Sequence, residues 1–225
     1  MRPIALAAAL AIASPLQADR LPVPTQDEAM QDAGLMAARE ALRDAVARRD
    51  TGAVVSMACP DIFLSFGGNG GRAEFRMNLT VPPEMLSEEY RHMADEMRDD
   101  YWRELADTLS YPGYFDTDGS FWMPRFWGME LPEEVDPFLA YFSRAGAKLR
   151  KKPSKLSKTL AVLDHELIVA EDFDDYEEPW RKVRLGDGTP GYVRAEDLRA
   201  LIGYRANMVQ NEAGTWQLCL FVAGD

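Results

Sequence analysis

Apolar residues recur every three or four positions near the start of the chain, and this spacing predicts an amphipathic helix. Thr25 and Glu28 fit a capping box that would begin the helix, which should end near Arg49. The residues expected on its buried face are Leu35, Ala38, Leu42, Ala45 and Val46.

The next apolar residues predict a short helix, a strand and a longer helix. Asp50 can cap a helix through Val55, and Pro60 should stop it. Residues 62–66 alternate as in a strand, with Ile62, Leu64 and Phe66 on one side, and the glycines of 67–71 predict a loop. Residues 83–109 have helical spacing, with the apolar positions Leu86, Tyr90, Met93, Met97, Tyr101, Leu105 and Leu109.

Aromatic residues are concentrated in 111–127, around the acidic stretch Asp116–Ser120. That stretch resembles the start of a calcium loop but lacks the remaining ligands, so a hairpin turn is the better interpretation. The aromatic cluster can be the core of a small sheet or the wall of a pocket. Residues 129–139 are acidic, carry two prolines and predict a connection into a second domain.

From Phe142 to Arg199, short apolar runs alternate with turn residues in the manner of a small barrel. Asp187-Gly188 is a favoured hairpin turn, and Trp180 starts a strand. Several short sequence motifs of this region resemble, in their order along the chain, those of the bacterial SH3-like domain family. They are Leu149 to Pro153-Ser154, Val162-Leu163, Trp180-Arg181-Lys182-Val183, Asp187-Gly188 and Gly191-Tyr192-Val193. This resemblance covers about 60 residues and implies a small β-barrel.

Members of that family are mostly non-catalytic binding domains of exported proteins, and many bind cell-wall peptides or other partners. This chain departs from the family pattern at the turn Asp164-His165-Glu166 and in the longer acidic loop before Trp180. Ligands usually differ at these places, so the resemblance does not identify the ligand.

Two further strands, 203–209 and 215–222, follow the predicted barrel. A lone hairpin is marginally stable, so we expect it to complete the N-terminal sheet. The N-terminal part also loosely resembles the α+β cone of the cystatin-like and ketosteroid-isomerase-like group. The expected class is α+β: a signal peptide (1–18), an N-terminal domain (19–139), an inserted SH3-like barrel (140–200) and a returning hairpin (201–225).

The expected signal peptide rests on Arg2, the apolar run from Ile4 to Ala13 and a small residue, Ala18, at the cleavage position. It predicts a periplasmic or secreted protein without membrane insertion after cleavage. The formal net charge of −12 argues against nucleic-acid binding. We expect no metal or other cofactor, because the two cysteines and two histidines lack the spacing of a zinc site.

The two cysteines, Cys59 and Cys219, suggest a disulfide in an oxidising compartment. The alternative is two separate buried cysteines that act as small apolar residues. A disulfide would require the C-terminal hairpin to pack beside the N-terminal strand.

Seven basic and no acidic residues occupy 144–158, whereas 164–178 contains eight acidic residues. These charges either compensate each other or leave a basic surface for an anionic partner, such as an acidic peptide or a carboxylate-rich glycan. The residues expected to bind it are Arg150, Lys151, Lys152, Trp180 and Tyr192. We therefore expect a non-catalytic envelope protein that binds a peptidoglycan-related ligand or a protein, and the alternative is a small-molecule or isomerase-like pocket in the N-terminal cone.

Overall fold

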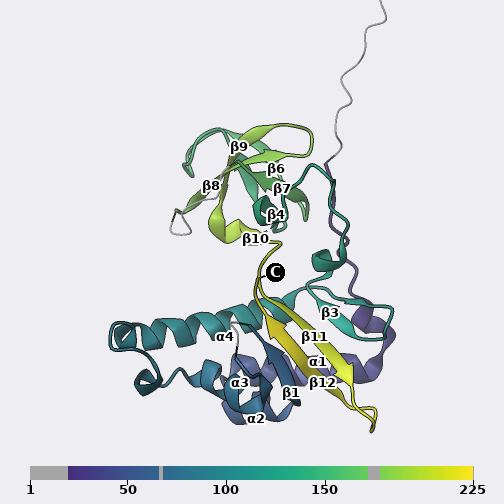
Figure 1. Cartoon of the computed structure of the whole chain (residues 1–225). Coiled ribbons are helices and arrows are strands. Elements are labelled where there is room, and N and C mark those ends of the chain that lie inside the picture. The colour runs from purple at the N-terminus through teal and green to yellow at the C-terminus, as the bar shows by residue number, and fades with distance from the viewer. Residues whose placement is uncertain (1–19, 66–67, 172–177, 225) are drawn as a thin grey trace, which may run out of the picture.

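The computed structural model describes residues 20–65, 68–171 and 178–224, which form helices and two β-sheets. The expected α+β class is confirmed. Figure 1 shows the helices beside one sheet, with the other sheet set apart from them. The expected signal peptide lies outside the described residues.

The first two helices follow the predicted pattern, but the first is capped differently. Helix α1 spans Ala33–Ala47 and buries Leu35, Leu42, Ala45 and Val46. Its N-cap is Asp32, whose carboxylate accepts the Leu35 N–H at 2.8 Å. The predicted Thr25–Glu28 capping box is wrong, because Glu28 reaches instead to the Phe115 N–H and to Arg125. Helix α2 (Thr51–Ser56) is capped by Asp50 as predicted.

The remaining helices differ from the prediction. Helix α3 (Gly71–Thr80) begins in the glycine-rich stretch that was expected to be only a loop. Helix α4 spans only Ala94–Ser110, because Leu86 is extended and interrupts the expected helix over 83–109. The short 3-10 helices are η1 (Glu28–Gln31), η2 (Pro83–Met85), η3 (Arg91–Met93), η4 (Arg125–Gly128), η5 (Pro137–Leu139) and η6 (Ala195–Asp197).

The first sheet combines strands from both ends of the described chain. Its order is β1 (Ala58–Leu64), β12 (Trp216–Val222), β11 (Arg205–Gln210), β3 (Phe121–Met123) and β2 (Tyr114–Phe115). Strand β12 pairs parallel with β1 and antiparallel with β11, so the C-terminal hairpin lies in the N-terminal sheet. Strand β1 starts before the predicted position and includes Pro60, which an edge strand tolerates.

The turn Asp116–Gly119 joins β2 and β3 as a hairpin, which confirms the preferred interpretation of the acidic stretch. The aromatic residues of this region divide between two clusters. Phe121 is in the apolar core between the helices and the first sheet, whereas Phe126 packs with Phe142 in a cluster beside the second sheet.

The second sheet uses seven strands from residues 140–200 in the order β10, β4, β7, β8, β9, β5 and β6. Their bounds are β4 (Ala140–Ser143), β5 (Lys148–Arg150), β6 (Thr159–Val162), β7 (Leu167–Ala170), β8 (Trp180–Leu185), β9 (Pro190–Arg194) and β10 (Leu198–Ala200). Asp187-Gly188 forms the β8–β9 turn, where Gly188 has a φ of +83° that favours glycine. Buried side chains from these strands form a separate core.

A buried arginine joins the two parts. Arg199 of β10 donates to Glu104, Asp107 and Thr108 of α4 at 2.8, 2.9 and 3.1 Å, and to the Tyr204 carbonyl at 3.0 Å. Arg144 also pairs with Asp107, at 2.9 Å. The guanidinium groups of Arg144 and Arg199 are therefore matched to carboxylates of α4.

The segment before η1 belongs with the second sheet, although it was expected to belong with the N-terminal domain. Leu21 accepts the Leu167 N–H through its carbonyl, and the Val23 N–H donates to the His165 carbonyl. Arg20 forms an ion pair with Glu166, whose side chain is buried.

Candidate functional site

Three of the five predicted ligand-binding residues, Arg150, Trp180 and Tyr192, lie on neighbouring strands of the second sheet. Arg150 of β5 is opposite Tyr192 of β9, and Tyr192 is opposite Lys182 of β8. Trp180 is opposite Arg194 on the same pair of strands. Because Arg181, Val183, Gly191 and Val193 are buried, the residues that alternate with them face outward.

Arg150 has a structural task in addition to its place on this face. Its guanidinium donates to the Ser157 carbonyl at 2.9 Å and to the Thr159 hydroxyl at 2.8 Å. These bonds hold the base of the turn that joins β5 to β6. A change at Arg150 would therefore disturb the turn as well as the surface charge.

Lys151 and Lys152 lie in that turn, on a segment that we call the lysine loop (residues 148–158). The Lys151 N–H donates to the Lys158 carbonyl at 3.0 Å, and this bond closes the loop. The lysines of the loop are all exposed, and within the part of the chain that the structure describes none of them forms an ion pair: Lys148, Lys151, Lys152, Lys155 and Lys158.

Apolar side chains lie among these lysines and remain uncovered. Leu156, within the loop, is 98% exposed, and Leu160 and Val162 on the following strand are 40% and 58% exposed. Strand β6 is at one end of the sheet order. The loop therefore joins unpaired positive charge to apolar surface at a sheet edge.

Glu171, the described acidic residue directly after β7, compensates a different group of cations. Glu171 accepts from Lys182 at 2.5 Å and from Arg184 at 2.6 Å. The hydrogen bond from Lys182, followed by the nearby positive charges, holds the pKa of Glu171 below its ordinary value. Asp172, Asp174, Asp175 and Glu177 lie outside the described residues. Among the described residues, ion-pair compensation is thus found at β8 and not at the lysine loop.

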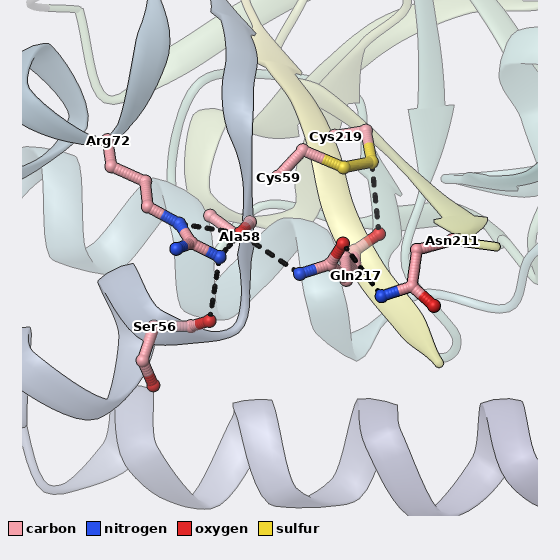
Figure 2. Close-up of a disulfide and its surroundings, with 7 residues drawn as sticks. All are labelled: Ser56, Ala58, Cys59, Arg72, Asn211, Gln217 and Cys219. Carbon is pink, nitrogen blue, oxygen red and sulfur yellow. Dashed lines mark hydrogen bonds between the residues drawn. A yellow bond between two sulfur atoms is a disulfide. The ribbon is translucent and has the colours of Figure 1, made fainter. Parts of the chain in front are cut away.

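Cys59 of β1 and Cys219 of β12 form a disulfide, as predicted, with their Cα atoms 4.8 Å apart. Figure 2 shows this bond beside the backbone of Ala58, whose carbonyl accepts from Arg72 and Gln217. Both strands are irregular there, because the β1–β12 and β11–β12 registers each shift across this region. Cys219 is the extra residue between Leu218 and Leu220 in the pairing with β11.

This irregularity corrects one detail of the predicted strand. Strict alternation along 215–222 would place Trp216, Leu218 and Leu220 in one packed row, but Phe221 is buried in the core and Leu220 is only partly buried. One extra residue in a strand reverses the faces of the residues that follow it. Hydrophobic alternation alone does not reveal such a residue.

Among residues 20–65, 68–171 and 178–224, no group of three His, Cys, Asp or Glu side chains is arranged to hold a metal ion. No helix in the same ranges is both long enough and apolar enough to cross a membrane. Sequence reasoning did not single out Lys182, Arg194 or Leu156 as site residues. The outward alternation of β8 and β9 could have identified Lys182 and Arg194, whereas the exposure of Leu156 depends on the loop conformation.

Comparisons with known proteins assign no family. No family model matches the chain, and no curated protein matches it. One similar solved structure is a putative calcium/calmodulin dependent protein kinase II association domain from Xanthomonas campestris, which is 12% identical. The comparison covers 92% of this chain and 95% of that chain, with a TM-score of 0.29. At this score the likeness carries no argument about fold or function.

Proposed function

We propose that this protein is a non-catalytic, exported binding protein of a bacterial envelope. In this proposal residues 140–200 are an SH3-like module, and the lysine loop with the adjoining face of β8 and β9 binds a carboxylate-rich component of the cell wall. The motif resemblance supports the module, and the disulfide is compatible with an oxidising compartment outside the cytoplasm.

The observation that carries the proposal is the unpaired charge of the lysine loop. Its five exposed lysines form no ion pair within the described residues, although the whole chain has a net charge of −12. Clustered positive charge attracts carboxylates from solution and increases the rate of encounter with them. Peptidoglycan stem peptides carry such carboxylates.

Neighbouring aromatic residues supply the surface that such a ligand would contact. Tyr192 lies between Arg150 and Lys182 in the cross-strand register, and Trp180 lies two residues before Lys182. Aromatic rings beside cationic groups can pack against the apolar part of a peptide or sugar while the cations bind its carboxylates. The exposed Leu156 adds apolar contact at the loop.

Co-sedimentation with isolated peptidoglycan tests the proposal. We expect the full-length mature protein to sediment with it at low salt, and the triple variant Lys151→Glu, Lys152→Glu and Lys155→Glu to bind at least about tenfold more weakly. Arg150 is left intact because it holds the turn. Arg43, Arg48 and Arg76 are exposed residues away from the second sheet, and their replacement by Glu gives a control with the same change in charge.

The outcomes separate specific binding from general electrostatics. Equal loss in the lysine-loop and control variants would show that only net charge matters, and unchanged binding in the lysine-loop variant would overturn the proposal. Circular dichroism of each variant establishes that the protein remains folded.

A further inference from the structure

A cleft of about 660 Å³ lies in the other part of the molecule, away from the lysine loop. Helices α3 and α4, the segment that follows α3, and Tyr204 directly before β11 provide most of its lining. Figure 1 shows where α3 and α4 lie in the fold. Its location depends on the break in the expected long helix, because residues 81–86 leave the helical path and line one side.

Methionines dominate the apolar part of the cleft and are unusually accessible. Met77, Met85 and Met97 are 37%, 63% and 42% exposed, and Val81 and Leu86 lie beside them in the lining. An exposed group of large apolar side chains around a hollow is typical of a binding surface. Methionine is flexible and polarisable, so such a lining adapts to apolar ligands of different shape.

Tyr101 provides a polar group in this lining. Its hydroxyl oxygen is buried and makes no well-formed hydrogen bond within the described residues. The ring is fixed by edge-to-face contacts with Phe75, Tyr204 and Phe221. Burial raises the pKa of Tyr101, and the nearby Asn78 side chain offsets part of this effect, so the hydroxyl stays protonated. A buried hydroxyl that is served only by the nearby Asn78 side chain, without well-formed geometry, is costly, and a ligand can supply a further hydrogen bond.

Among the described residues, the charges that line the cleft are all negative: the carboxylates of Glu74, Asp100 and Glu104, with no Lys, Arg or His beside them in the lining. Glu104 is paired with Arg199 at 2.8 Å, and Asp100 with Arg103 at 2.7 Å. Glu74 forms no ion pair among the described residues, and its carboxylate accepts the Gly70 N–H at 2.8 Å. Glu74 is therefore the carboxylate available to a cationic ligand.

We propose that this cleft binds a small amphipathic amine, with its apolar chain against Met77, Met85 and Met97 and its ammonium group beside Glu74. The positively charged ammonium group can form an ion pair with the Glu74 carboxylate. It can also donate a hydrogen bond to the Tyr101 hydroxyl oxygen. An anionic amphiphile of the same length would instead meet the carboxylate of Glu74, which lacks an ion pair among the described residues. This site is separate from the surface proposed to bind the cell wall, so either proposal can fail alone.

Calorimetric titration with three probes of one chain length tests the inference: decylamine, decanol and decanoate, each below its micellar concentration at neutral pH. We expect saturable binding of decylamine that is about five- to tenfold tighter than that of decanol, with decanoate the weakest. Glu74→Gln should remove most of the preference for decylamine over decanol. The matched control is Glu212→Gln, in the exposed β11–β12 turn, which should preserve the preference.

Met85→Lys provides a second variant at an exposed position. It places a cation at the cleft and should weaken decylamine binding while strengthening decanoate binding, which loss of folding cannot produce. Absence of saturable decylamine binding, decanoate binding as tight as decylamine binding, or an unchanged order of affinities in both cleft variants would overturn the inference.

Discussion

The Cα atoms of Cys59 and Cys219 are 4.8 Å apart although 160 positions separate the two residues in the chain. Their disulfide encloses the whole second sheet and joins the edge strand β1 to β12. We expect reduction to lower the free energy of unfolding by about 2–5 kcal/mol, since the reduced unfolded chain regains the freedom of a long loop. Urea denaturation with and without reductant measures this change.

The double variant Cys59→Ala and Cys219→Ala is the control for effects of the reductant itself. It should have the stability of the reduced protein and show no further response to reductant. Equal stability of the oxidised and reduced wild-type protein would contradict the prediction.

Arg199→Met should destabilise the contact between the two parts of the molecule. The change leaves Glu104, Asp107, Thr108 and the Tyr204 carbonyl without their shared donor, in a setting where the Arg199 side chain is only 10% exposed. The expected loss is about 3 kcal/mol in thermal or urea unfolding. Arg103→Met removes an exposed ion pair from the same helix and should cost less than about 1 kcal/mol. Similar losses in the two variants would refute the assigned role of Arg199.

Glu28→Gln should change the acid sensitivity of the fold. Hydrogen bonds from the Phe115 N–H, and then from Arg125, lower the pKa of Glu28 from its ordinary value of 4.5. The unfolded chain therefore takes up this proton at higher pH than the folded chain, so the stabilisation is present above pH 4.5 and is lost as the pH falls through the folded pKa.

The variant should be less stable than the wild type by about 1 kcal/mol near neutral pH, and the difference should shrink in acid. Urea midpoints across an acid pH series measure this difference, with the exposed Glu40→Gln as the control. A constant difference at every pH would show that the Glu28 charge is not responsible.

Leu156→Ser separates a binding role from a structural one. Because the side chain is 98% exposed, the free energy of unfolding should change by less than about 0.5 kcal/mol. Peptidoglycan co-sedimentation should nevertheless decrease, since apolar contact at the lysine loop is lost. Met30→Ser changes another exposed apolar residue, on η1, and should leave binding intact. Undiminished binding of Leu156→Ser would remove this leucine from the proposed surface.

Local chemistry predicted several elements of this fold. The Asp50 cap of α2, the Asp187-Gly188 turn and the disulfide follow from side-chain hydrogen bonding, turn geometry and compartment chemistry. The predicted helix over 83–109 was correct only from Ala94 onward, because its spacing did not reveal the extended backbone at Leu86. Helix α3 was missed because a glycine-rich start resembles a loop, although its buried residues Phe75 and Leu79 have helical spacing.

The candidate sites show the same division between local and long-range information. Composition identified the basic segment 144–158, but only the fold shows that Arg144 pairs with Asp107 while the five lysines form no ion pair within the described residues. The cleft could not be predicted, because Glu74, Tyr101 and Tyr204 come from three separate segments of the chain. Of its methionines, only Met97 lies on the apolar face of the predicted helix over 83–109, and helical spacing does not distinguish a buried face from an accessible one.

The position of β12 between β1 and β11 imposes an order on biosynthesis. A ribosome that has just made β1 must translate more than the entire second sheet before the parallel neighbour of β1 exists, which takes on the order of 10 s. All seven strands of the second sheet are complete by Ala200, so that sheet has its partners before β12 is made. The early helices and β1 meanwhile lack the strand that completes their sheet until Val222 has been made.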